Sequence, residues 1–431
     1  MPEYSFDIEH AAPSSTKASA CSVEPGSVKD MSEILHILGS TQMPFAVKGG
    51  GHATNPGFSS TRGIQIAMRR FNETKVNSAS GTVEVGAGLT WDQVYATLAL
   101  TGVNVVGGRM TGVGIAGLML GGGYSYKTSQ YGLALDNVAG YELVLPNGTV
   151  ICVTSNDDDL WFGLRGIVTK FILKSHPQSD IWGGFLFYAE NQLDAVKNAL
   201  VEFQQKNDTK ASVGVSLSYS SGQLSLLSLF FYDGPTSSGV FGDFLAIPTT
   251  GGNVSTMSFF DLIQNMGPLF GTNGLRQFCE SIPVIHYSPA LFDTFVNQTK
   301  LWGARLSPLD KNMTLSSALE PFDKGLFSHG SGSAYLPDRS HAVFPSVVTA
   351  QWSNASLDET MAIALRNMSK TINAAALADG QNVSHAAAYG NYALFGRPLE
   401  DLYGGNVERV RKIRAAIGPE DVMGLAGGWK F

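Results

Sequence analysis

Hydrophobic residues recur with two different periods along the first quarter of the chain. In residues 27–38 they fall three or four positions apart, after a serine that can cap a helix, and residues 90–98 repeat this spacing. Residues 44–47, 63–68 and 81–85 are short apolar or alternating runs next to glycines, which favours strands. The pattern predicts short strands interrupted by short helices, an α+β arrangement.

The same kind of pattern continues beyond residue 140. Residues 141–144 and 149–153 predict a hairpin, because the Pro-Asn-Gly sequence at 146–148 favours a tight turn. The acidic run at 157–159 is interpreted as the cap of a short helix rather than as a metal site. No ligand spacing typical of a metal centre and no nucleophile elbow of a hydrolase is found, so neither chemistry is expected.

Glycine clusters become rare after residue 177, which suggests a domain boundary. We interpret residues 18–176 as one domain, residues 177–384 as a second domain of mixed strands and helices, and residues 385–431 as a separate C-terminal segment with an amphipathic helix at 404–417. Residues 1–17 are mostly polar, and we expect a disordered or truncated start there.

Composition narrows the classes of partner. The chain has 431 residues, 44% of them hydrophobic, and a formal net charge of -7. Without a basic cluster, nucleic acid is not expected as a partner, and no apolar run approaches the roughly 18 residues of a membrane helix. Cys21, Cys152 and Cys279 allow either one disulfide with a free thiol or three buried thiols. Nothing in the sequence predicts the oligomeric state.

Glycosylation signals favour a secreted, extracellular protein. Asn-x-Ser/Thr triplets begin at Asn72, Asn147, Asn207, Asn253, Asn297, Asn312, Asn354, Asn367 and Asn382. They are more numerous than chance would produce. Residues 1–20, however, contain no apolar core of a signal peptide. Either that peptide is missing from this sequence, or the triplets are unused.

Two segments, residues 48–51 and 107–123, concentrate glycine beyond the needs of turns. Without a Cβ, backbone N–H groups can crowd together and face an anion such as a pyrophosphate. One such loop would more simply be a flexible connection. Two of them in one domain favour ligand binding.

The second segment contains a literal G-x-G-x-x-G at 112–117, after an apolar strand at 103–106 and ahead of Asp136. These features match the sequence pattern of a dinucleotide-binding site. The glycines at 121–123 would end the long helix that this fingerprint requires. A nicotinamide-binding unit is therefore a minor alternative.

The order of these motifs resembles the FAD-linked oxidases of the vanillyl-alcohol oxidase and berberine-bridge-enzyme type. The motifs are Lys48-Gly49-Gly50-Gly51-His52, Gly86-Ala87-Gly88, Val113-Gly114-Ile115-Ala116-Gly117, Gly121-Gly122-Gly123, Tyr131-Gly132-Leu133, Asp136-Asn137-Val138, Asp159 to Gly166 with Ile167-Val168-Thr169, Tyr389-Gly390-Asn391-Tyr392, Tyr403 to Asn406, and Pro419 to Val422. The resemblance covers residues 21–176 and 385–431 well and the middle of the chain poorly.

The resemblance implies a fold and a cofactor. The fold is α+β: a PCMH-type FAD-binding domain of two small α+β subdomains, and a substrate domain with an antiparallel sheet covered by helices. The C-terminal segment, 385–431, carries the berberine-bridge motif and returns to the FAD domain. The cofactor implied is FAD.

The resemblance also implies the residues that hold the FAD. They are His52, Lys48, Gly49, Gly50, Gly51, Ala53, Gly88, Met110, Thr111, Val113, Gly114, Gly117, Gly121, Gly122, Tyr124, Asp136, Ile167, Val168 and Asn391. His52 matches the histidine that bonds to the flavin in the family; on its own it would be interpreted as a loop histidine. Met110 stands where some members have a second, cysteinyl tether, so a single covalent link is expected. Val113 matches the position that gates oxygen, where valine is typical of oxidases, although a core valine would fit equally well.

The catalytic residues implied are Tyr389 and Asn391, the family's Tyr-x-Asn. A base must take a proton from the substrate while hydride leaves for the flavin. Because the ordinary pKa of tyrosine is about 10, Tyr389 must be acidified by its neighbours or act within a relay. The alternative interpretation of both residues is an aromatic patch that packs the C-terminal helix.

The resemblance predicts an oxidase that passes hydride from a small organic molecule to FAD and regenerates the flavin with O2, yielding H2O2. A dehydrogenase or an oxidative cyclase of the same fold is an alternative. Relatives carry about half a dozen more residues between the segments matched by Gly166 and Ile167, where the family places backbone against the flavin. This shortening favours a third hypothesis, a catalytically silent secreted scaffold with impaired FAD binding.

Overall fold

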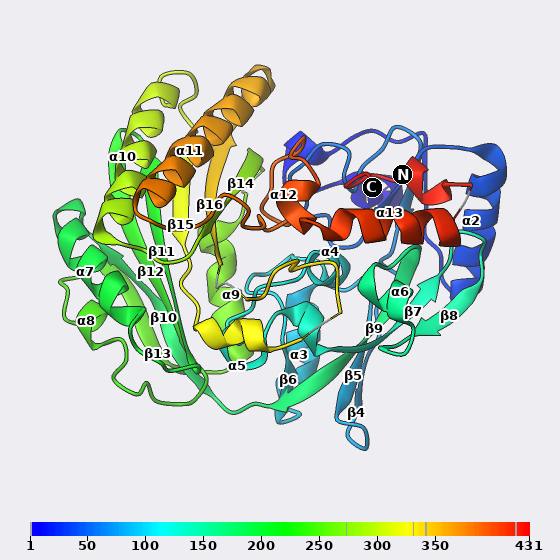
Figure 1. Ribbon diagram of the computed structural model, residues 1–431, viewed down its shortest axis with the longest axis horizontal. Helices are drawn as coiled ribbons and strands as arrows, with labels where there is room; N and C mark the ends of the chain where they lie inside the picture. Colours follow the sequence, from blue (N-terminus) through cyan, green and yellow to red (C-terminus); the bar gives the residue numbers. More distant parts are fainter. Residues whose placement is uncertain (1, 273, 331, 341–342, 419) are drawn as a thin grey trace.

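The computed structural model describes residues 2–272, 274–330, 332–340, 343–418 and 420–431. Figure 1 shows two lobes. One contains the first part of the chain together with the C-terminal helix, and the other contains a large sheet with helices on its outer side. Among the described residues, no helix has both the length and the apolar character needed to cross a membrane.

The first lobe, which we call the FAD lobe, begins with a small parallel sheet. Its strands are β1 (Cys21–Val23), β3 (Ile64–Ala67) and β2 (Phe45–Lys48), in that order. Helix α2 (Val28–Thr41) begins where expected, because the Ser27 side chain accepts a hydrogen bond from the backbone N–H of Asp30.

In a second sheet of the FAD lobe, every strand pair among the described residues is antiparallel. Its order is β4 (Thr74–Asn77), β5 (Thr82–Gly86), β9 (Ile167–Pro177), β7 (Val138–Val144) and β8 (Val150–Val153), with β6 (Val103–Val105) paired to β9. The hairpin expected around the Pro-Asn-Gly turn is confirmed as β7 and β8. These two small α+β units agree with the fold class predicted from the sequence.

Short helices connect these strands. They are α3 (Trp91–Leu98), α4 (Ile115–Leu120), α5 (Thr128–Tyr131), the 3-10 helix η2 (Ala134–Asn137) and α6 (Asp158–Phe162). Helix α4, which follows the G-x-G-x-x-G sequence, has only 6 residues and ends at Gly121. The argument against a nicotinamide-binding unit is therefore confirmed, since that unit needs a long helix at this point.

The second lobe, the substrate lobe, has one antiparallel sheet of seven strands. Their order is β13 (Gly251–Met257), β10 (Ile181–Tyr188), β12 (Gln223–Tyr232), β11 (Ala211–Ser220), β15 (Thr314–Leu319), β16 (Phe344–Trp352) and β14 (Arg276–Val284). The chain changes sheets between Pro177 and Ile181.

Helices cover the outer side of this sheet (Figure 1). They are α7 (Leu193–Phe203), α8 (Gly242–Leu245), α10 (Pro289–Leu306) and α11 (Asp358–Ala378), with 3-10 turns η3 (Glu190–Gln192) and η5 (Ala355–Leu357). The 3-10 turn η4 (Lys324–Ser328) instead packs against α5 of the FAD lobe. Helix α9 (Phe259–Phe270) behaves differently, because Phe259 and its buried neighbours join the core of the FAD lobe. The Phe259 ring lies edge-on to Tyr95, with centroids 4.9 Å apart.

The N-terminal segment is ordered over its described residues, contrary to the expectation of disorder at 1–17. It forms α1 (Pro2–Ile8) and the 3-10 turn η1 (Pro13–Ser15). Its polar groups make hydrogen bonds with both lobes: the backbone Ala11 N donates to Gly51 O at 3.0 Å, and the side-chain Ser14 Oγ donates to Gln277 O at 3.0 Å. Polar composition failed as a signal of disorder here because these polar groups pair with the rest of the protein.

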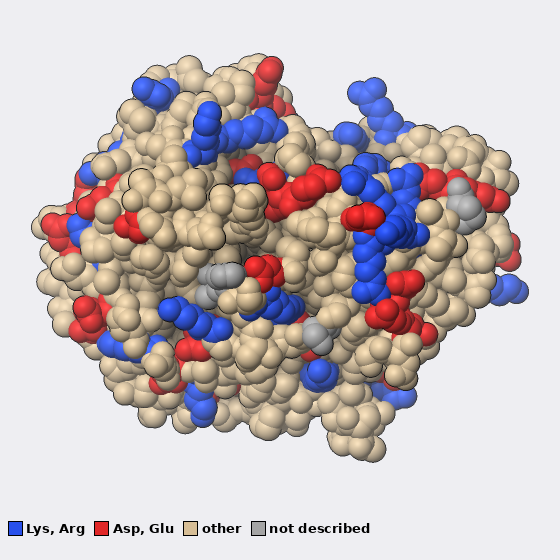
Figure 2. Space-filling view, viewed as in Figure 1, with Lys and Arg blue, Asp and Glu red and all other residues tan. Residues whose placement is uncertain are grey.

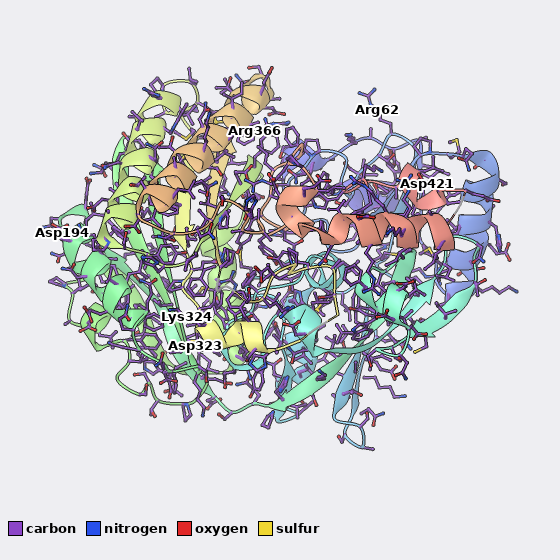
Figure 3. The ribbon with its side chains drawn as sticks, in the orientation of Figure 1. Arg62, Asp194, Asp323, Lys324, Arg366 and Asp421 are labelled. Carbon is purple, nitrogen blue, oxygen red and sulfur yellow. The ribbon has the colours of Figure 1, made fainter. Side chains whose placement is uncertain are left out.

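The C-terminal segment returns to the FAD lobe, as the resemblance implied. It contains α12 (Glu400–Tyr403), α13 (Asn406–Ile417) and η6 (Val422–Leu425), and Ala426 bridges to Phe45 in β2. Asp421, labelled in Figure 3, accepts a hydrogen bond from Arg165 Nη2 at 2.7 Å. The motif at 159–166 and the motif at 419–422, which are far apart in the sequence, therefore contact each other in the fold.

Charged side chains of both signs are interleaved over α13 (Figure 2), and ion pairs account for several of the basic ones. Arg409 Nη2 lies 2.8 Å from an oxygen of Asp158 and 3.0 Å from one of Asp159. Asp157 directly precedes α6 but makes no side-chain capping hydrogen bond, and Asp158 and Asp159 pair with a cation of α13. All three cysteines are free thiols, but Cys21 and Cys152 are exposed, so neither a disulfide nor the alternative of three buried thiols is found.

Candidate active site between the two lobes

One cavity of ≈ 520 Å³ lies between the FAD lobe and residues 389–392. Pockets for cofactors and small ligands commonly have volumes of about 300–1,000 Å³. Residues of both glycine segments and of the Tyr-x-Asn sequence line this cavity. Gly50 and Tyr389, for example, are almost 340 positions apart along the chain. The fold therefore brings the main sequence signals to one place.

Most of the predicted site residues line this cavity. They are Gly49, Gly50, Gly51, His52, Ala53, Met110, Val113, Gly114, Gly117, Gly121, Tyr124, Ile167, Val168, Tyr389 and Asn391. We call the part formed by residues 49–51 and 113–117 the glycine wall, and the part formed by Tyr124, Tyr389 and Tyr392 the tyrosine wall.

The glycine wall is built from two stretches of backbone in direct contact. A Cβ on Gly50 would lie 2.5 Å from the backbone nitrogen of Gly114, and a Cβ on Gly114 would lie 2.4 Å from that of Gly50. Such distances leave no room for any side chain. The bare backbone beside an open cavity matches what a pyrophosphate-bearing cofactor needs, so the residues present fit FAD.

His52 follows the first glycine run and its side chain faces the cavity. Burial lowers the pKa of its imidazole. The ring is therefore neutral at neutral pH, with one nitrogen lone pair available to act as a nucleophile or acceptor.

Five predicted residues do not line the cavity. Lys48 Nζ instead donates to Phe6 O at 2.6 Å, and a Cβ on Gly88 would meet Met68 O at 2.0 Å, so Gly88 serves close strand packing. Thr111 lies against α9, where a Cβ on Gly267 would be 2.5 Å from Thr111 Oγ1.

The other two are Gly122 and Asp136. The carboxylate of Asp136 pairs with Arg339 at 2.8 Å and also accepts a hydrogen bond from Leu133 N at 2.9 Å. Gly122 has φ +108° and faces the ring of Tyr335. Both residues therefore bind other parts of the protein rather than facing the cavity.

Tyr389 and Asn391 form a connected pair in the tyrosine wall. Asn391 Nδ2 donates to the Tyr389 hydroxyl at 2.8 Å and to Leu118 O at 3.2 Å. A Cβ on Gly121 would lie 2.1 Å from Asn391 Oδ1, so this glycine makes room for the amide. Burial raises the pKa of Tyr389, whereas the hydrogen bond from Asn391 lowers it less. The phenol is protonated at neutral pH and suits a relay rather than a free base.

Sequence reasoning missed a charged group behind this pair. Arg109 Nη2 lies 3.0 Å from Glu320 Oε2 and donates to the Tyr392 hydroxyl at 2.8 Å. Burial acts to lower the pKa of Arg109, but Glu320 and Tyr392 raise it above its usual value. The position of Arg109 inside the second glycine segment could have marked it; no local signal marked Glu320.

The shortened junction at Gly166 and Ile167 still forms part of the wall. Gly166, Ile167 and Val168 all line the cavity, and β9 begins at Ile167. A Cβ on Gly166 would meet Val144 O at 2.3 Å. The chain therefore reaches the cavity directly, without an intervening loop.

Comparisons with known proteins agree with this geometry. The family described as "FAD binding domain" matches residues 19–154. The FAD-dependent monooxygenase tpcD of Cochliobolus heterostrophus is 30% identical over 441 residues, covering 96% of this chain and 85% of that protein. An uncharacterized FAD-linked oxidoreductase of Arthroderma benhamiae is 35% identical over 255 residues, which cover 56% of this chain and 51% of that protein. The chain thus spans about half the length of this second relative.

Two solved structures share the fold. BBE-like 1 from Physcomitrella patens superposes with a TM-score of 0.78 at 20% identity, covering 98% of this chain and 94% of that one. Glucooligosaccharide oxidase from Acremonium strictum, which carries a 6-S-cysteinyl, 8α-N1-histidyl FAD, gives a TM-score of 0.78 at 17% identity, over 96% of this chain and 92% of that one. At such identities the likeness concerns the fold alone.

Proposed function

The chain belongs to the FAD-linked oxidoreductases of the vanillyl-alcohol oxidase and berberine-bridge-enzyme type, and we propose that it oxidises a small organic molecule with molecular oxygen as the electron acceptor. The observation that carries this proposal is the single cavity that joins the glycine wall to Tyr389 and Asn391. One side offers bare backbone for a cofactor. The other offers positioned polar groups for chemistry on a substrate.

When bound, FAD would supply the hydride acceptor for this oxidation. The residues that would hold it are those of the glycine wall, together with Ile167 and Val168. Val113 lines the same cavity; a side chain of its size leaves more space than the bulkier aliphatic residues expected of dehydrogenases. This supports oxygen as the acceptor and hydrogen peroxide as the product.

His52 is proposed as the single covalent tether of the flavin. Its neutral imidazole faces the cavity, as a nucleophilic attachment requires. Met110 also lines the cavity and, as a thioether, provides no thiolate for a second link. The histidyl linkage in the glucooligosaccharide oxidase supports the first tether, and its cysteinyl linkage has no counterpart at Met110.

Tyr389 is proposed to pass the substrate proton through its hydroxyl. Its raised pKa means that it accepts a proton only as it gives up its own. Asn391 keeps the hydroxyl in place through the 2.8 Å hydrogen bond and remains a positioning residue. Beside this pair, the Tyr392 ring stands edge-on to Tyr389 with centroids 4.8 Å apart, and the Tyr392 hydroxyl accepts a hydrogen bond from Arg109, which pairs with Glu320.

The first test is acid precipitation of protein from a secretory eukaryotic host. Flavin colour retained in the washed pellet, and released in a His52→Ala variant, is the expected result. Flavin only in the supernatant would remove the tether but keep the flavoenzyme. Flavin in neither fraction would overturn the proposal and favour the silent scaffold.

A second test separates the oxidase from the chemistry named for the relative tpcD, which is described as a monooxygenase. During turnover with a substrate found by screening, hydrogen peroxide should form in proportion to the product. An oxygen atom inserted into the product, without peroxide, would replace the oxidase proposal with a monooxygenase.

We also propose that the protein is secreted and glycosylated. The asparagines of all nine Asn-x-Ser/Thr triplets are exposed, which glycan attachment requires. A mobility shift after enzymatic removal of N-glycans would support this. An unshifted band from a secretory host would contradict glycosylation.

A further inference from the structure

One loop carries the proposed flavin attachment at His52 and has no regular secondary structure to hold it. Residues 52–59 lie between the first glycine run and β3, and within this described range there is neither a helix nor a strand. Most of these residues line the cavity. We call residues 52–59 the tether loop. Because it makes no ladder hydrogen bonds, its position depends on bonds to other parts of the protein.

A second loop, residues 389–395, carries the Tyr-x-Asn sequence and also consists of turns and irregular chain. We call it the Tyr-x-Asn loop. The substrate lobe holds both of its ends. Tyr389 N donates to Ser281 Oγ, in β14, at 3.0 Å. Arg366, labelled on α11 in Figure 3, donates from Nη2 to Phe395 O at 2.8 Å. These bonds fix the loop to β14 and α11, but not to the tether loop.

Asn55 joins the two loops. Its Nδ2 donates to Ala393 O at 2.8 Å, and its Oδ1 accepts from Phe395 N at 3.1 Å. A turn presents this side chain, since Pro56 restricts the backbone next to it and Phe58 N donates to Asn55 O at 3.3 Å. Among the described residues, no other hydrogen bond connects the tether loop with the Tyr-x-Asn loop.

The amide of Asn55 suits this role because it offers a donor and an acceptor at a fixed spacing. Exchanging its oxygen and nitrogen would set oxygen against Ala393 O and N–H against Phe395 N–H, so the two bonds determine its orientation. The side chain is buried. If the loops moved apart, Ala393 O and Phe395 N would lose their partners away from water, which is costly. One side chain therefore sets the separation of the two loops.

We propose that Asn55 is a positioning residue that keeps the two loops in register, so that a flavin attached at His52 and the Tyr389 hydroxyl stay at a constant separation. This inference rests on the proposed function, because it concerns the geometry of that active site. Asn55 acts through the loops, since backbone groups engage both polar ends of its amide. A misplacement of about 1 Å between reacting groups can cost about 10²-fold in rate. Turnover should therefore respond strongly to the loss of Asn55.

The first measurement is deuterium exchange of the purified protein, which requires no bound flavin. Asn55→Ala removes both hydrogen bonds between the loops. We expect about tenfold faster exchange in peptides that cover residues 389–396 and in those that cover residues 52–59. Unchanged exchange in either loop would overturn the proposal, because the loops would then be held by something other than Asn55.

The second measurement separates positioning from cofactor binding, during turnover of a substrate found by screening. We expect kcat of Asn55→Ala to fall about tenfold or more, with little change in KM or in the flavin retained in an acid-washed pellet. A loss of flavin as large as the loss of kcat would overturn the proposal, because Asn55 would then serve cofactor binding. An unmodified protein without flavin would overturn the proposed function instead, and the exchange experiment would decide the coupling of the loops on its own.

Asn55→Asp provides a rescue that depends on the hydrogen bonds alone. A protonated carboxyl group offers one donor and one acceptor, as the amide does, whereas an ionised one offers only acceptors and repels Ala393 O. Burial raises the pKa of such a carboxyl group. Compared with the unmodified protein at the same pH, Asn55→Asp should behave almost normally at about pH 5 and resemble Asn55→Ala at about pH 8. Identical behaviour of the two variants at both pH values would overturn the proposal.

The matched control is Gln204→Ala. At the end of α7, Gln204 uses its amide in the same way, because Nε2 donates to Tyr287 O at 3.1 Å and Oε1 accepts from Tyr287 N at 2.8 Å. It lies outside the cavity lining. Its loss should lower the melting temperature about as much as the loss of Asn55, with kcat and the exchange of both loops unchanged. Equal losses of kcat in the two alanine variants would overturn the proposal, because the loss of any such amide would then have the same effect.

Discussion

The two walls of the cavity are made in opposite ways. The glycine wall is built around glycine backbone, and two stretches of chain touch there at Gly50 and Gly114. The tyrosine wall consists of side chains from distant segments; Asn391 holds the Tyr389 hydroxyl, and Arg109, paired with Glu320, holds the Tyr392 hydroxyl. Added atoms should therefore damage the first wall, and removed atoms the second. The glycine wall was visible in the sequence as runs of glycine, whereas Tyr124, Tyr389 and Asn391 were marked only through the family resemblance.

The largest effect is expected from Gly50→Ala. The new methyl group would lie 2.5 Å from the Gly114 nitrogen and 2.6 Å from its Cα, and backbone on both sides cannot move away as a flexible side chain would. Overpacking of this kind costs about 1–3 kcal/mol or more. We expect almost complete loss of bound flavin, measured by absorbance per mole of protein, and a lower melting temperature.

Two glycine variants serve as controls for this prediction. Gly117→Ala adds a methyl group to the same wall, but no protein atom lies within 4 Å, so the fold should persist and any flavin loss would report contact with the cofactor. Gly214→Ala, in β11, likewise meets nothing and should change neither property. Normal flavin content in Gly50→Ala would refute the idea that close backbone contact shapes the wall.

Removing one atom from the tyrosine wall should affect turnover rather than cofactor content. Tyr389→Phe deletes the hydroxyl that Asn391 positions, and general acid–base catalysis typically contributes about 10²–10⁴-fold. We expect kcat to fall by about 10²-fold or more, with flavin content unchanged. Tyr403→Phe is the matched control, because it removes another hydroxyl from the cavity lining. Equal losses in both variants would argue against a special role for Tyr389.

Local sequence signals predicted the FAD lobe well. Ser27 and the helical period after it located α2, and the Pro-Asn-Gly turn located the hairpin of β7 and β8. These elements depend on neighbours in the chain. Helix α9 escaped notice because its apolar face packs into the other lobe, which is a property of the fold and not of the segment.

The candidate site shows the same division. Runs of glycine are visible in the sequence. No sequence motif marks Glu320, which pairs with Arg109, or Tyr335, whose ring the fold places beside Tyr389. Asp136 shows the reverse case. It sits in a motif, yet the structure pairs it with Arg339 outside the cavity. A motif predicts a place in the fold more reliably than it predicts the contacts of each member.

A smaller effect, on pH dependence, is expected behind the tyrosine wall. Burial raises the pKa of Glu280 from 4.5 to about 7, and Arg397 opposes this only in part. The next residue, Ser281, accepts a hydrogen bond from Tyr389 N at 3.0 Å. A carboxyl group whose pKa is raised in the folded state stabilises that state fully at pH values below the pKa of the unfolded chain. This stabilisation is lost as the pH rises through the pKa of the folded state. The contribution of Glu280 to the free energy of unfolding should therefore decline by about 2–3 kcal/mol between pH 4.5 and 7.

The measurement is the difference between unfolding curves of the unmodified protein and Glu280→Gln across that range. Taking the difference matters because the pKa of His176 is lowered to about 4, which changes stability in the opposite direction as pH rises. The variant should be less pH-dependent than the unmodified protein. Parallel curves would mean that Glu280 does not titrate in this window.

The smallest effect tests whether the glycine wall works without a cation. The family resemblance assigned Lys48 to the cofactor, but its ammonium group donates to Phe6 O at 2.6 Å and lies outside the cavity lining. Lys48→Met keeps the length of the side chain and removes this charged hydrogen bond, worth about 1.5–3 kcal/mol before the release of a buried charge offsets part of it. We therefore expect a loss of about 1 kcal/mol in unfolding free energy and unchanged flavin content. A marked fall in flavin content would return Lys48 to the cofactor site and show that the wall needs its charge as well as its bare backbone.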